Sequence, residues 1–158
     1  THNVSSAASD VYKRQVFDTY YKSHDQYLED HRDGYQTVGD IAYVDNEGYY
    51  FICDRKKDMI ITGGVNVYPA EIENVLDDHP QVAEVAVFGI PDDEWGEAVC
   101  AVIVCMDNLN EKELINFAKD RLSGPKVPKK VFIRSDLPKT GSGKVLKREL
   151  KQWVQENS

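Results

Sequence analysis

The chain has 158 residues, a formal net charge of −8 and three cysteines. This length suits one domain, or one small domain with part of another, and the acidic balance argues against general nucleic-acid binding. No apolar run approaches the roughly 20 residues that span a membrane, and the histidines show no metal-ligand spacing. The cysteines form no CxxC pair, so we expect no disulfide framework, no metal site and a reducing, cytoplasmic setting.

Residues 1–15 are polar and rich in Ser and Ala, with neither helical nor strand periodicity. They look like an unrelated or adapter-derived leader, and we exclude them from the fold prediction. Farther on, Asp33-Gly34 predicts a turn before a short strand that ends at Asp40. A carboxylate beside glycine at a strand end can accept hydrogen bonds from two vicinal ribose hydroxyls, although an ordinary turn aspartate fits the same pattern.

Two hairpins are predicted on either side of a charged connector. Alternating apolar residues around Asn46-Glu47-Gly48 predict the first hairpin, over residues 41–53. Residues 54–58 are all charged and cannot be buried together, so they indicate a solvated connector. A short apolar strand over residues 59–61 then reaches Gly63-Gly64, which predicts a tight turn and gives a ligand close access to the backbone.

The second half of the chain predicts a small α+β domain. Pro69 is suited to the first position of a helix, with Glu71 and Glu73 in its first turns, where the helix dipole favours negative charge. Apolar periodicity predicts further helices over residues 111–122 and from residue 146 onward. Apolar runs predict strands over residues 82–90, 98–106 and 131–133, the second of them central. We therefore expect a small sheet covered by two or three helices.

A glycine-rich segment, Leu-Pro-Lys-Thr-Gly-Ser-Gly-Lys at residues 137–144, precedes the last predicted helix. It is not a P-loop, because Pro138 stands where the first glycine is required and Val145 where Ser or Thr must bind magnesium. The segment is instead a glycine-rich loop that presents Lys144. An ordinary solvated loop lysine explains the same pattern. Basic residues dominate residues 126–151, which suits an anionic ligand such as the phosphates of coenzyme A, or a solvated helix face.

Three of these stretches resemble motifs of the adenylate-forming acyl-CoA synthetase superfamily, which includes firefly-type luciferases and the adenylation domains of peptide synthetases. Residues 54–73 are similar to its hinge motif, residues 33–40 to its ribose-binding motif and residues 137–144 to its C-terminal catalytic loop. The resemblance runs from about Val16 to the C-terminus. It implies that residues 16–56 end a large AMP-binding domain and that residues 57–158 form the mobile C-terminal domain.

The resemblance also implies roles for individual residues. Asp40 and Arg55 would hold the ribose of AMP, and Lys144 would contact both the substrate carboxylate and the α-phosphate. Lys57 would be the pivot between the two domains. The resemblance also implies three residues that contact coenzyme A: Gly63, Gly64 and Trp95. The glycine turn would lie against the pantetheine arm, and the Trp95 ring would stack on the coenzyme. An ordinary core aromatic is an equally good reading of Trp95.

The sequence departs from the family pattern at three positions. Thr19 replaces an expected glycine, and Val38 replaces a threonine that would add a hydroxyl contact near Asp40. Pro125 stands where relatives usually carry an aromatic residue, which removes any coenzyme contact made by that ring.

The implied function is that of an ATP-dependent carboxylic acid–CoA ligase that acts on a fatty or related hydrophobic acid. Its acyl adenylate would form first and the acyl-CoA thioester second, with rotation at Lys57 between the two steps. The partners would be the acid, ATP, CoA and an N-terminal domain that binds Mg, and without that domain we expect no activity. The alternatives are an adenylation module of a peptide synthetase and a stand-alone CoA- or carrier-binding domain without chemistry.

Overall fold

The computed structural model describes residues 21–32, 35–37, 39–106 and 109–157. The expected leader, the start of the family resemblance at Val16, the turn at Asp33-Gly34, and the departures at Thr19 and Val38 lie outside the described residues. The chain divides into two compact units, Thr1–Lys57 and Asp58–Ser158, and each is described by itself below. No helix among the described residues is long and apolar enough to cross a membrane.

The described residues of the first unit form one helix and two antiparallel strand pairs, with these bounds: α1 His24–Asp30, β1 His31–Arg32, β2 Tyr35–Gln36, β3 Asp40–Val44 and β4 Tyr50–Arg55. The β3–β4 pair is the hairpin predicted over residues 41–53. Its turn is closed by Asp45, whose Oδ1 accepts hydrogen bonds from the backbone N–H groups of Glu47 and Tyr49 at 2.9 Å each. On the strands, the rings of Tyr43 and Phe51 stack at a centroid distance of 5.0 Å.

The second unit is an α+β domain built on a five-stranded mixed sheet. Its elements are β5 Ile60–Thr62, β6 Val65–Val67, α2 Pro69–Asp77, β7 Val82–Asp92, β8 Gly96–Cys105, α3 Glu111–Lys119, a 3-10 helix at Gly124–Lys126, β9 Lys130–Arg134 and α4 Lys147–Glu156. The strands β6, β5, β8 and β7 follow one another across the sheet in antiparallel pairs, and β9 pairs with β8 in parallel. Strand β8 is central, as predicted, and β7 forms an edge.

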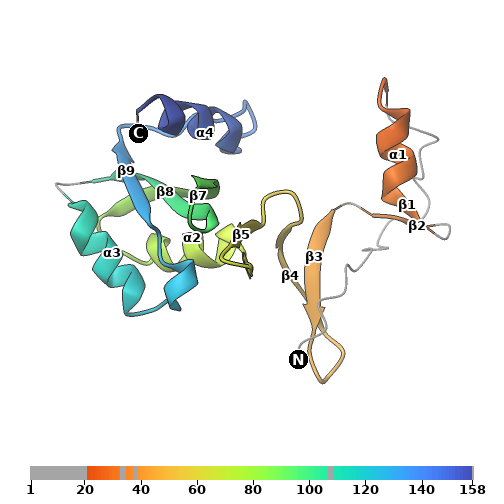
Figure 1. Ribbon diagram of the computed structural model, residues 1–158, viewed down its shortest axis with the longest axis horizontal. Coiled ribbons are helices and arrows are strands. Elements are labelled where there is room, and N and C mark those ends of the chain that lie inside the picture. Colours follow the sequence, from red (N-terminus) through yellow and green to blue (C-terminus); the bar gives the residue numbers. More distant parts are fainter. Residues whose placement is uncertain (1–20, 33–34, 38, 107–108, 158) are drawn as a thin grey trace. The chain divides into compact units, whose positions relative to one another are not determined.

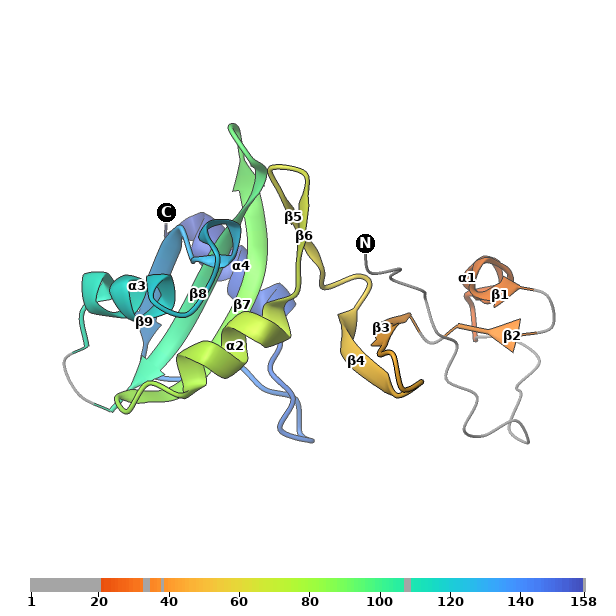
Figure 2. The ribbon, with the colours of Figure 1, turned by 90° about the horizontal axis from the view of Figure 1, so that it is seen from below.

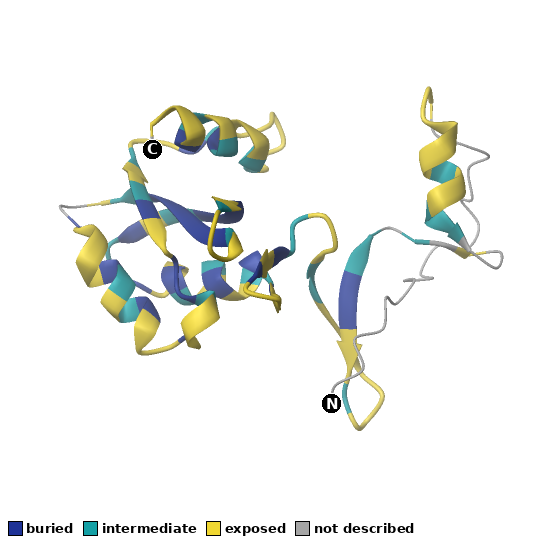
Figure 3. Ribbon diagram, viewed as in Figure 1, coloured by how far each residue is buried: buried dark blue, intermediate teal, exposed yellow. Residues whose placement is uncertain are grey.

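Helices cover both faces of this sheet: α2 and α3 pack on one face and α4 on the other (Figure 1). The apolar run in β7 explains how, because successive side chains point to opposite faces. Val87 joins the cluster under α2 and α3, whereas Phe88 joins the cluster under α4. Burial is concentrated on β7, β8 and the sheet-facing sides of the helices (Figure 3). The predicted α+β architecture is confirmed.

Several element boundaries differ from the prediction, among them the ends of β7 and α3. Strand β7 continues through Pro91 to Asp92 instead of closing at residue 90. Proline is tolerated there because β7 is an edge strand and needs no N–H donor on its outer side. Helix α3 ends at Lys119 rather than at residue 122, although Leu122 stays buried through a final turn in which its N–H donates to the Ala118 carbonyl.

Candidate functional site

The segment that carries Lys144 is a short hairpin closed by its own hydrogen bonds. Lys139 and Val145 form an isolated antiparallel bridge, and the Thr140 N–H donates to the Lys144 carbonyl at 2.8 Å. Within the turn, the Gly143 N–H donates to the Thr140 carbonyl at 2.9 Å, with Gly143 at φ +85°, a conformation that favours glycine. Among the described residues, no ion pair or hydrogen bond involves the exposed Lys144 ammonium. The hairpin thus presents a cation without engaging it.

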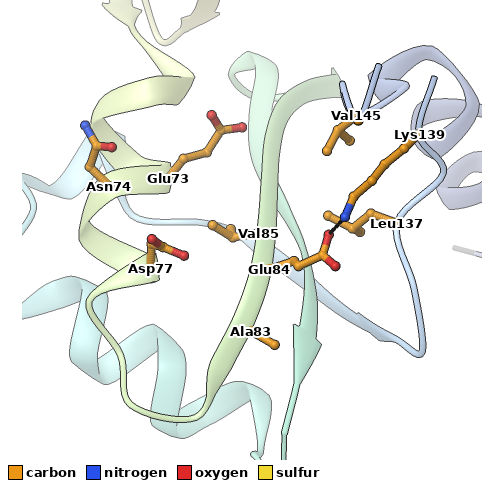
Figure 4. Close-up of a pocket in the computed structure, with 10 residues that line it drawn as sticks. Glu73, Asn74, Asp77, Ala83, Glu84, Val85, Leu137, Lys139 and Val145 are labelled. Atoms are coloured by element: carbon orange, nitrogen blue, oxygen red, sulfur yellow. Dashed lines mark ion pairs between the residues drawn. The ribbon is translucent and has the colours of Figure 1, made fainter. Parts of the chain in front are cut away.

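Two ion pairs attach this segment to the rest of the unit. Lys139 Nζ lies 2.6 Å from Glu84 Oε2 on β7, and Lys147 Nζ, at the start of α4, lies 2.7 Å from Glu73 Oε1 on α2. Between them lies an open groove of about 540 Å³. Figure 4 shows its walls, with α2 on one side, the segment bearing Lys139 on the other and β7 between them.

The Gly63-Gly64 turn forms as predicted, but its two glycines differ in surroundings. Strands β5 and β6 pair directly through Thr62 and Val65, so the two glycines occupy the tight turn, at φ +56° and +78°. A Cβ on Gly63 would come within 2.7 Å of Trp95 Cε3, whereas one on Gly64 would meet nothing within 4 Å. Close access to the backbone therefore applies to Gly64 and not to Gly63.

Trp95 is 41% exposed, so the reading of a core aromatic is wrong. It sits in the β7–β8 turn, where Asp92 Oδ1 accepts a hydrogen bond from the Trp95 N–H at 2.9 Å. The Trp95 carbonyl accepts a hydrogen bond from the Gly63 N–H at 2.9 Å, and Lys129 Nζ lies 5.3 Å from the centre of its ring. An exposed indole, an open glycine and a lysine thus gather at one end of the unit, a combination that can bind a ligand with both apolar and anionic groups.

The Lys144 segment and the Gly63-Gly64 turn belong to the same unit but not to the same site. In Figure 2 the β5–β6 turn and the blue segment that precedes α4 lie at opposite ends of this unit. The departure at Pro125 falls in the 3-10 helix, whose Lys126 forms an ion pair with Glu71 on α2 at 2.6 Å.

In the first unit, Asp40 and Arg55 face each other across the end of the β3–β4 hairpin. They are direct register partners, and Arg55 Nε lies 4.0 Å from Asp40 Oδ1. The Lys56 N–H donates to the Gly39 carbonyl at 2.7 Å, which closes the pair of strands behind them. Both side chains remain partly exposed, so the carboxylate can accept hydrogen bonds from a ligand while the guanidinium lies beside it. Lys57 follows in a turn, at the division between the two units.

Within the described ranges, ionisable groups elsewhere form no further reactive centre. No group of three or more His, Cys, Asp or Glu among the described residues could hold a metal ion. All three cysteines are free, and burial raises the pKa of the Cys100 thiol to about 12, which keeps it protonated and inert.

Sequence reasoning missed the residues that support these sites. Glu97 Oε2 accepts a hydrogen bond from the Ile61 N–H at 2.7 Å and so ties β5 to β8. Glu84 and Glu73 fasten the Lys144 segment. The sequence does carry a signal for two of them, because residues 84 and 97 are single charges inside or beside an apolar strand. Such a charge is expected to have a specific partner or to mark the edge of a sheet.

Comparison with known proteins places these features in a family. Residues 71–144 match the family described as the AMP-binding enzyme C-terminal domain. The 2-succinylbenzoate–CoA ligase of Bacillus cereus is 42% identical over 137 residues, which cover 87% of this chain and 28% of that protein. The chain thus spans less than a third of the length of the curated relatives it matches.

Solved structures agree with this assignment. ATP-bound MatB from Rhodopseudomonas palustris has a TM-score of 0.81 and 38% identity, covering 89% of this chain and 29% of that one. A fatty acyl CoA synthetase from Mycobacterium tuberculosis has a TM-score of 0.67 and 40% identity, covering 89% and 28%. With the family match over residues 71–144, these likenesses show that the chain belongs to the adenylate-forming, AMP-binding enzyme superfamily and contains its C-terminal domain.

Proposed function

We propose that this chain works as part of an ATP-dependent carboxylic acid–CoA ligase. In the first half-reaction the carboxylate attacks the α-phosphate of ATP and forms an acyl adenylate, with pyrophosphate leaving. In the second, the CoA thiol attacks the acyl carbon, and AMP leaves. The observation that carries the proposal is the exposed Lys144 on a self-closed glycine hairpin, in a domain of the adenylate-forming superfamily. Its ammonium has no ion pair or hydrogen bond with any described residue.

Lys144 is proposed as the catalytic cation of the first half-reaction. Two anions, a carboxylate and a triphosphate, must approach each other, and negative charge then builds on the α-phosphate. A positioned ammonium stabilises that charge more in the transition state than in the ground state, which is the requirement for rate acceleration. The lack of a partner for Lys144 within the described unit supports this role, because its charge is available to a ligand.

Asp40 and Arg55 are proposed to hold the ribose of ATP and of the adenylate. An ionised carboxylate can accept hydrogen bonds from both vicinal hydroxyls, and the adjacent guanidinium, 4.0 Å away, helps to orient it. Magnesium is proposed to be bound by the N-terminal part of the enzyme.

Coenzyme A is proposed to approach the opposite end of the C-terminal domain. There Gly64 leaves its backbone open, and the exposed ring of Trp95 and Lys129 lie nearby. Gly63 contributes by letting Trp95 pack against the turn. Because this end and the Lys144 hairpin lie apart (Figure 2), one domain could serve both half-reactions only by turning.

Lys57 is proposed as the pivot of that rotation. Residues 16–56 would then end the large AMP-binding domain, and residues 57–158 would form the mobile domain. The division of the chain into compact units between Lys57 and Asp58 supports this assignment. A reducing cytoplasmic setting is also proposed, since all three cysteines are free.

The acid itself is proposed only as a carboxylic acid. The curated relative from Bacillus cereus is a 2-succinylbenzoate–CoA ligase, while one structural relative is a fatty acyl CoA synthetase. These names do not support the sequence expectation of a fatty acid over an aromatic acid. Both 2-succinylbenzoate and a series of fatty acids are therefore the acids to assay.

The test uses a complete enzyme that contains this chain and measures each half-reaction separately. Lys144→Ala should slow acid-dependent pyrophosphate exchange about a hundredfold or more, because it removes a positioned cation at developing charge. Thioester formation from supplied acyl adenylate and CoA should remain. Lys112→Ala, which removes an exposed lysine of α3, is the control and should leave both rates unchanged. Equal loss of both half-reactions in Lys144→Ala would contradict the assigned role.

A further inference from the structure

The hairpin that presents Lys144 is fastened on both sides of that residue. Lys139, at its first strand, forms an ion pair with Glu84, and Lys147, just beyond its second strand, forms one with Glu73. The intervening turn contains Gly141 and Gly143, whose backbones are intrinsically free to move. The position of Lys144 therefore depends on what holds the two ends of the hairpin.

Glu73 is itself held in place by the sheet. Its Oε1 accepts a hydrogen bond from the Val87 N–H at 2.8 Å, in addition to the ion pair with Lys147 at 2.7 Å. This N–H lies on the outer edge of β7, where the described residues provide no further strand to accept it. One carboxylate thus contacts the edge of β7 and the first residue of α4, so it connects α2 on one face of the sheet with α4 on the other.

The second pair acts from the same edge of the sheet. Glu84 lies on β7, and Figure 4 shows Lys139 reaching its carboxylate from the segment on the far side of the groove. Both glutamates line the groove beside β7, and each pairs with a lysine that flanks Lys144 in sequence. Among the described residues, neither carboxylate forms an ion pair with Lys144 itself.

We propose that Glu73 and Glu84 are positioning residues for Lys144: the ion pairs Glu73–Lys147 and Glu84–Lys139 fix the two ends of the hairpin against β7 and so aim its catalytic cation. This inference rests on the proposed function for the catalytic role of Lys144. The two ion pairs that hold the hairpin do not depend on that role. Neither glutamate touches substrate. Each acts by restricting the directions in which Lys144 can point.

A plain stabilising role is the competing explanation, and the chain contains a matched control for it. Glu71, on the same helix as Glu73, forms an ion pair with Lys126 at 2.6 Å, and neither residue lies on the Lys144 hairpin. Removing that pair costs the domain a comparable contact without loosening the hairpin. Glu73→Gln and Glu84→Gln can therefore be compared directly with Glu71→Gln.

The first measurement is made on the 158-residue chain and needs no activity. Backbone amide order parameters of residues 141–144 should fall in Glu73→Gln and in Glu84→Gln, and stay at wild-type values in Glu71→Gln. The charge-reversed double variant Glu84→Lys with Lys139→Glu should restore them. Unchanged order in the two test variants, or an equal fall in Glu71→Gln, would overturn the proposal.

The second measurement uses the complete enzyme. Glu73→Gln and Glu84→Gln should each slow adenylate formation about tenfold, because misplacement of a catalytic group is costly, while thioester formation from supplied acyl adenylate is retained. If the wild-type enzyme forms no adenylate, the proposed function fails, and the order parameters alone decide whether these residues hold the hairpin. If the hairpin loosens while adenylation keeps its full rate, the positioning role is refuted and the proposed function stands.

Discussion

The indole of Trp95 lies against Gly63 so closely that a Cβ on Gly63 would come within 2.7 Å of its Cε3 atom. The Gly63 N–H also donates to the Trp95 carbonyl at 2.9 Å. Backbone and ring together therefore join the β5–β6 turn to the β7–β8 turn. Gly63 is a packing position as well as a turn residue, unlike its neighbour Gly64.

We expect Gly63→Ala to destabilise the chain more than Gly64→Ala. Both substitutions place a side chain on a left-handed backbone, at φ +56° and +78°, which costs about 1–2 kcal/mol. Only Gly63→Ala also forces a clash with Trp95, and such overpacking adds about 1–3 kcal/mol. Urea unfolding of the two variants measures the difference.

A double-mutant cycle identifies the source of that difference. In a Trp95→Ala background the clash is absent, so Gly63→Ala should cost no more than the backbone strain shared with Gly64→Ala. The same cost of Gly63→Ala with and without Trp95 would show that the ring is not responsible.

Elements governed by local rules could be predicted from the sequence. The Gly63-Gly64 turn follows from the freedom of glycine at positive φ, and the start of α2 follows from Pro69 and its fixed φ. The central position of β8 follows from its unbroken apolar run. The resemblance of residues 137–144 to the catalytic loop of the superfamily indicated Lys144 as a candidate site residue from the sequence alone.

Contacts between distant segments could not be predicted. The pairing of Glu73 with Val87 and Lys147 depends on how α2, β7 and α4 meet at one sheet edge, and no local pattern carries that information. The close packing of Trp95 on Gly63 likewise depends on two turns meeting in space. The end of β7 was predicted too early because proline was read as a strand terminator, which does not hold on an edge strand.

Gly64→Leu tests the proposed coenzyme side of the domain. A leucine there would occupy the open space above the turn, so thioester formation should fall about tenfold or more by obstruction of the approaching thiol, while adenylation is kept. Gly48→Leu is the matched control, because Gly48 also has a positive φ and a Cβ there would likewise meet nothing within 4 Å, but it lies in the β3–β4 turn. Rapid-quench measurement of each half-reaction distinguishes the two, and a comparable loss in both half-reactions would argue against the coenzyme assignment.

Cys100 should make the stability of the chain fall at alkaline pH. Burial raises the pKa of its thiol from 9.0 to about 12, so above pH 9 the unfolded chain loses a proton that the folded chain keeps. Unfolding then becomes easier with rising pH, by up to about 1.4 kcal/mol per pH unit between 9 and 12. Below pH 9 both states keep the proton, and the contribution is constant.

The check compares urea unfolding of the wild type, Cys100→Ala and Cys105→Ala at several pH values above about 8, where thiols begin to ionise. Lysines and tyrosines also titrate in this range, so the informative quantity is the difference in slope between variants. Cys100→Ala should lose part of the alkaline slope, and Cys105→Ala should keep it. Parallel curves for wild type and Cys100→Ala would mean that the thiol ionises equally in both states.

Lys57→Pro tests the proposed pivot. In the described part of the chain no hydrogen bond involves the Lys57 backbone N–H, so proline removes no contact there, but it fixes φ near about −65°. If the two half-reactions need different orientations of the C-terminal domain, one should survive and the other collapse, with little change in melting temperature. Lys57→Ala, which leaves φ free, is the control and should preserve both rates. Wild-type rates for both half-reactions in Lys57→Pro would refute rotation at this residue, because both reactions would then proceed with the same fixed φ at residue 57.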